Sequence, residues 1–99
     1  MSKIDTEVRH ITPVGGNIFA DLGHSPEEAN KLKLKSQLMM QIERWIKVSD
    51  LTQAQAAEIL SVTRPRVSDL VRGKIGKFTI DALVDMVERT GHHVTLEVA

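Results

Sequence analysis

Residues 51–73, LTQAQAAEILSVTRPRVSDLVRG, contain two short helical patterns separated by a tight turn. Thr52 is a suitable N-cap, and residues 53–60 are rich in Ala, Gln, Glu and Leu, which favour helix. A second helix is predicted to begin after Thr63 as its cap, with Pro65 in its first turn, where the missing N–H is not needed. The sequence therefore predicts two adjacent short helices.

The two predicted helices share a seam of apolar side chains. Small Ala57 would let the second helix cross closely over the first. Ser61 lies in the turn, and a positive φ there would cost about 1 kcal/mol relative to glycine. The expected seam consists of Ala57, Ile59, Leu60, Val62, Val67 and Leu70. The residues expected to face outward are Arg64, Arg66, Ser68, Asp69 and Arg72.

The net charge is zero, but the charges are unevenly distributed. Residues 61–78 carry five basic side chains and one acidic side chain, a sum of +4. Residues 31–60 sum to +2, whereas residues 1–30 and 79–99 each sum to −3. The positive charge therefore lies on the second predicted helix and the loop after it, as a protein that binds nucleic acid requires.

Two helices joined by a tight turn, the second of them basic, are the arrangement that a helix-turn-helix needs, in which the N-terminal end of the second helix enters the major groove of DNA. A pair of helices with only a structural role is the alternative. Arg64 and Arg66 are candidates for reading guanine, which accepts two hydrogen bonds from one arginine, and Arg64 lies at the entering end. Asp69 is suited either to accept from cytosine or to orient a nearby arginine. Thr63 and Ser68 are short donors for phosphate or base.

Basic residues also follow the second predicted helix. Gly73 is placed to end that helix. Arg72, Lys74 and Lys77 are candidates for phosphate contacts, and a solvated basic loop is the alternative.

The rest of the chain predicts two more helices and a strand. Ser25, with Glu28 completing a capping box, starts a helix that runs to about Val48. Thr79 caps a helix that Gly91 ends. The first of these helices is expected to face the core with Leu34, Leu38, Met39, Met40, Ile42, Trp45 and Ile46. The chain is then mainly all-α, with four to five helices.

The domain boundaries follow from these elements. We expect an N-terminal arm or loop at 1–24, a DNA-binding domain at 25–91 with its motif at 52–72, and a short C-terminal β-strand at 92–99. A lone strand is unstable, so it must pair within the chain or with a second subunit. In the arm, residues 13–23 form either a loop anchored to the domain or a segment that docks on a partner.

The motif resembles the Xre/Cro (lambda repressor-like) family of DNA-binding domains. The matching residues are Thr52, Gln53, Ala56, Ala57, Val62, Val67, Ser68, Leu70 and Gly73. Ser61 departs from the family, which usually has glycine there. Gln53 is similar to the glutamine with which the family clamps a phosphate. Residues 16–23 and 78–80 extend the resemblance to a HigA-like antitoxin subfamily.

The resemblance implies a transcriptional regulator. We expect a repressor that binds double-stranded DNA as a homodimer on a pseudo-palindromic operator, in the cytoplasm at the nucleoid. The alternative that the resemblance implies is the antitoxin of a type II pair, which binds a toxin protein directly and regulates its own operon.

Other function classes find no support in the sequence. The chain has no cysteine, which excludes disulfides and thiolate metal sites. No nucleophile–base pair, metal-ligand cluster or phosphate loop is recognisable, so we expect neither an enzyme nor a cofactor nor a metal. No stretch is apolar enough to span a membrane.

Overall fold

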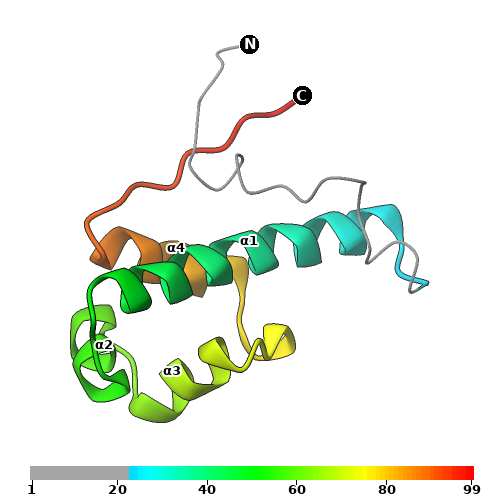
Figure 1. Cartoon of the computed structure of the whole chain (residues 1–99). Coiled ribbons are helices and arrows are strands. Elements are labelled where there is room, and N and C mark those ends of the chain that lie inside the picture. The colour runs from blue at the N-terminus through cyan, green and yellow to red at the C-terminus, as the bar shows by residue number, and fades with distance from the viewer. Residues whose placement is uncertain (1–22) are drawn as a thin grey trace.

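The computed structural model describes residues 23–99, so the predicted arm at 1–24 lies almost entirely outside the described residues. Within that range the chain forms α1 (Pro26–Val48), α2 (Gln53–Leu60), α3 (Arg64–Val71), the 3-10 helix η3 (Ile75–Lys77) and α4 (Ile80–Arg89). The long helix α1 packs along α4, and α2 packs against α3 (Figure 1). None of the helices described is both long and apolar enough to cross a membrane.

The helix starts were predicted correctly, because their caps are local. Ser25 Oγ accepts from the Glu28 N–H at 3.2 Å, which is half of the expected capping box. Thr52 and Gln55 form a complete box: Thr52 Oγ1 accepts from the Gln55 N–H at 3.1 Å, and Gln55 Oε1 accepts from the Thr52 N–H at 2.9 Å. Thr79 caps α4 through its side chain. These bonds satisfy amides that a helix leaves unpaired at its first turn.

The core lies between α1, α4 and the α2–α3 pair. Its buried side chains are Leu38, Met39, Ile42, Ile46, Ala56, Ala57, Leu60, Val67, Leu70, Phe78, Leu83, Met86 and Val87. The prediction that Ile59 joins this seam was wrong, because its side chain is 44% exposed. Met40, at 48%, also faces away from the core, whereas Trp45 packs partly buried against it.

The turn between α2 and α3 depends on a left-handed residue. Ser61, which stands where the resembling family usually has glycine, has φ 56° and ψ 42°. This conformation lets the Val62 N–H donate to the Ala57 carbonyl at 3.0 Å and turns the chain toward α3. Residues with a Cβ adopt this region at a cost that glycine avoids.

Replacing Ser61 with glycine is therefore expected to stabilise the fold by about 1 kcal/mol. The measurement is the free energy of unfolding from urea titration. Ser49→Gly is the control, since Ser49 ends α1 at φ −83°, where a side chain is unstrained. An equal gain in both variants, or a loss at position 61, would contradict the assigned strain.

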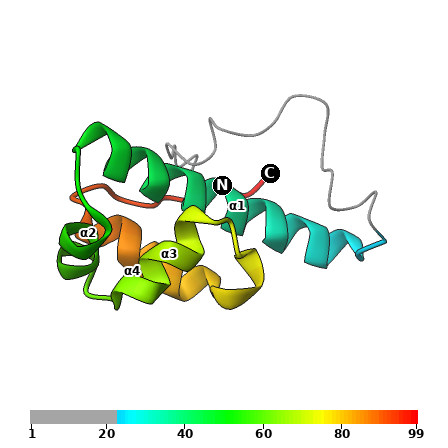
Figure 2. The same cartoon turned by 60° about the horizontal axis from the view of Figure 1, so that its bottom comes forward.

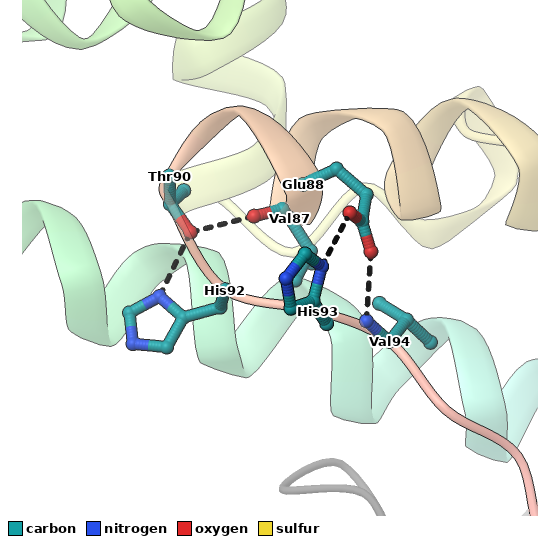
Figure 3. A network of polar contacts seen from close by, with 6 residues as sticks. All are labelled: Val87, Glu88, Thr90, His92, His93 and Val94. Atoms are coloured by element: carbon teal, nitrogen blue, oxygen red, sulfur yellow. Dashed lines mark hydrogen bonds and ion pairs between the residues drawn. The ribbon is translucent and has the colours of Figure 1, made fainter.

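The predicted strand at 92–99 was wrong, since the described residues contain no strand. The side chain of Glu88 on α4 holds this segment instead (Figure 3). Its Oε2 accepts from the Val94 N–H at 2.9 Å, and its Oε1 pairs with His93 Nδ1 at 2.9 Å. The Val94 amide and then His93 lower the pKa of the Glu88 carboxyl, because both contacts favour the ionised form. The carboxylate thus takes an N–H that a strand ladder would use.

Candidate nucleic-acid interface

Helix α3 is held by its apolar face and presents its N-terminal end to solvent. Val67 and Leu70 are buried, whereas Thr63, Arg64 and Pro65 are exposed. In Figure 1 α3 lies on the opposite side of α1 from the C-terminal segment, and in Figure 2 α2 and α3 again lie together on one side of α1. The predicted motif therefore places a rigidly packed helix with an accessible leading end on one side of the molecule.

Arg64 is the first residue of α3. Its side chain is exposed and makes no ion pair within residues 23–99. Thr63 has the extended backbone of an N-cap, but its side chain makes no capping hydrogen bond, unlike Thr52 and Thr79. Both side chains are thus accessible to a ligand at the leading end of α3.

Arg66 does not face outward as expected. Its Nη1 donates to the Lys77 carbonyl at 2.7 Å, and its guanidinium carbon lies 4.2 Å from the centroid of the Phe78 ring. The side chain is half-buried, because the cation stacks on an aromatic face and a carbonyl satisfies one donor. Arg66 therefore ties α3 to the loop after it, and reading a base would require it to leave these contacts.

Asp69 is paired with lysines rather than with an arginine. Its Oδ1 lies 3.6 Å from Lys74 Nζ, and its Oδ2 lies 3.8 Å from Lys77 Nζ. The Asp69 side chain is 19% exposed, whereas those of Lys74 and Lys77 are 44% and 58% exposed. Asp69, Lys74 and Lys77 are therefore brought together beside α3. Of the two roles expected for Asp69, pairing with an arginine is not seen among the described residues, and acceptance from cytosine stays a prediction.

The other predicted contacts surround this group. Ser68 is half-buried on α3, and Arg72 is exposed at its C-terminal end. Gln53 is the first residue of α2 and is partly exposed. Neither α2 nor α3 has an acidic residue in its first turn, so both positive helix ends remain favourable for anions.

Two features of the site were missed by sequence reasoning. Phe78 is buried, and its ring supports Arg66. Residues 75–77 form η3 where a plain loop was expected. The sequence did contain a signal for the contact between Arg66 and Phe78. Phe78 is the one aromatic residue within 61–78, a stretch in which arginines are concentrated. Among the residues described, no group of His, Asp and Glu is placed to hold a metal ion.

Comparison with known proteins agrees with this geometry. A family model described as a helix-turn-helix domain matches residues 18–99. The chain belongs to this helix-turn-helix family. A solved structure named as an XRE family transcriptional regulator is similar to it, with a TM-score of 0.69 and 25% identity, covering 73% of this chain and 81% of that one. No curated protein matches the sequence.

This helix-turn-helix chain accordingly has the all-α fold of XRE-like regulators. The family indicates a DNA-binding transcriptional regulator rather than an enzyme. Residues 18–22 of the match, within the predicted subfamily hallmark, lie outside the described residues.

Proposed function

We propose that the protein is a sequence-specific transcriptional repressor that binds a pseudo-palindromic operator as a homodimer. The observation that carries this proposal is the exposed Arg64 at the first position of α3, which makes no ion pair among the described residues and lies at a helix end without acidic residues. An arginine at the leading end of a groove-binding helix can donate two hydrogen bonds to guanine O6 and N7.

In this proposal α2 and the loop after α3 position the protein on the DNA backbone. The N-terminal amides of α2 and the side chain of Gln53 bind one phosphate. Thr63 and Ser68 donate to phosphate or base, and Arg72, Lys74 and Lys77 supply attraction that does not depend on sequence. Arg66 orders the loop that carries two of these lysines.

The length of α3 supports a dimer. Its eight residues span about 12 Å, so one copy reads only one segment of major groove. Two copies related by a two-fold axis would place their α3 helices about 34 Å apart in successive major grooves. The operator of such a dimer is pseudo-palindromic.

The Arg64→Ala variant is expected to bind the operator about 5- to 150-fold more weakly, which corresponds to about 1–3 kcal/mol for a lost guanine contact. The operator would be a duplex enriched by the wild-type protein from a random pool, and fluorescence anisotropy would give its affinity. Arg44→Ala, which removes an equal charge from an exposed position on α1, is the matched control.

Three results would contradict this function. They are failure to enrich any duplex, binding of one chain per duplex, and an equal loss of affinity in the Arg44 and Arg64 variants. The expected stoichiometry is two chains for each operator.

The alternative proposal is an antitoxin that binds a toxin protein directly. The exposed Asp81 and Asp85 on α4 would suit a basic partner, although Glu88 on the same helix is engaged with His93 and Val94. The exposed Arg64 at the leading end of α3 supports DNA-binding repression as the first proposal.

A further inference from the structure

Asp69 is an unusual residue for a surface that binds DNA. It is the one acidic residue among residues 61–78, which carry five basic ones. It lies on α3, the helix that the proposed function places in the major groove. A carboxylate there repels phosphate, and its two oxygens face two lysines, Lys74 at 3.6 Å and Lys77 at 3.8 Å.

The loop does not need this carboxylate to stay on α3. The Lys74 N–H donates to the backbone carbonyl of Asp69 at 3.0 Å, and Arg66 Nη1 donates to the Lys77 carbonyl at 2.7 Å. Both bonds are independent of the Asp69 side chain. The distinct effect of the carboxylate is therefore on the ammonium groups of the two lysines.

The two ion pairs are suited to exchange. Charge-assisted contacts of an ammonium group with an oxyanion are about 2.7–2.9 Å at their best, and both pairs here are longer. Partly exposed pairs of this kind contribute little to stability. A phosphate that comes close to both lysines can therefore replace Asp69 as their partner.

We propose that Asp69 is a positioning residue that competes with DNA phosphate for Lys74 and Lys77. In the free protein it holds both lysines as ion pairs. When α3 is seated in a major groove, the phosphates flanking the groove take both lysines. This inference rests on the proposed function and adds to it a carboxylate within the chain that lowers the affinity for DNA.

The test compares Asp69→Asn, which keeps the shape and removes the charge, with the wild type on operator and random duplexes over a series of KCl concentrations. On both duplexes the variant is expected to bind about tenfold more tightly, because two ion pairs no longer have to be broken before the lysines can contact phosphate. This gain should shrink as the KCl concentration rises, because salt screens these charges.

A second pair of variants isolates the lysines. Lys74→Met/Lys77→Met should abolish the gain that Asp69→Asn gives on random DNA, because the released groups are then absent. Asp85→Asn is the charge control, as it removes one exposed carboxylate from α4. Thermal unfolding followed by circular dichroism would verify that each variant is folded.

The other outcomes overturn the inference. Loss of operator affinity alone in Asp69→Asn would make Asp69 a reader of a base. An effect matched by Asp85→Asn, or one that persists without the lysines, would be a general charge effect. A wild-type protein that binds no duplex would overturn the proposed function as well, whereas normal wild-type binding with an unchanged Asp69→Asn variant would overturn this inference alone.

Discussion

The Phe78→Ala variant is expected to lose about 3–5 kcal/mol of unfolding free energy, the range for truncating a buried aromatic side chain. Phe78 is 1% exposed and is among the largest fully buried side chains of the described core. Small domains have a total stability of about 5–15 kcal/mol, so this loss removes a large fraction of it. Urea denaturation followed by circular dichroism measures the effect.

The same substitution acts on the DNA-binding surface, because the Phe78 ring lies under the Arg66 guanidinium. Phe78→Leu separates the two effects: it retains most of the apolar volume, which costs less than about 1.5 kcal/mol, but removes the aromatic face. We expect Phe78→Leu to remain folded with a more weakly held Arg66. If the free energy of unfolding of Phe78→Ala lies within about 1 kcal/mol of the wild-type value, burial of the Phe78 side chain does not stabilise the core as expected.

The elements that the sequence predicted well are those set by neighbouring residues. Thr52 and Gln55 are three positions apart, so their mutual capping depends only on local chain geometry. The sequence marked Ser61 as the turn position where a positive φ would carry a cost, and its φ is 56°. For the same reason α1 begins and ends where its cap and periodicity predicted.

The parts of the site that were missed depend on contacts across the fold. Arg66 and its acceptor on Lys77 are 11 residues apart, and they meet only because the chain reverses at Gly73, where φ is 72°. A rule that places charged residues in solvent gives no reason for Arg66 to cover Phe78. Likewise, the sequence showed one acidic residue among basic ones but not which of them Asp69 contacts.

The C-terminal segment shows a different limit. Alternation of apolar and polar residues at 92–98 predicts a strand, but a strand exists only where another strand supplies hydrogen-bond partners. In the described residues the side chain of Glu88 binds the Val94 amide instead. Periodicity reports which face of a segment is apolar, and Val94 does pack against the core.

Adjacent residues of α2 provide the second test of the core, since sequence analysis assigned both to the apolar seam. Leu60 is 0% exposed and Ile59 is 44% exposed. Leu60→Ala is expected to cost about 2–5 kcal/mol through lost burial and the cavity it leaves. Ile59→Ala should cost less than about 1 kcal/mol, because its side chain already contacts water.

The comparison is well controlled, because both substitutions shorten a branched aliphatic residue to alanine, a good helix former, in the same helix. The Leu60 carbonyl also accepts from Arg89 Nη1 at 3.1 Å, and this backbone contact between α2 and α4 does not depend on the side chain at position 60. Any large difference in urea midpoint therefore reports core packing alone. Equal losses in the two variants would mean that Ile59 is covered in solution by a surface outside the described residues, such as a second copy of the chain.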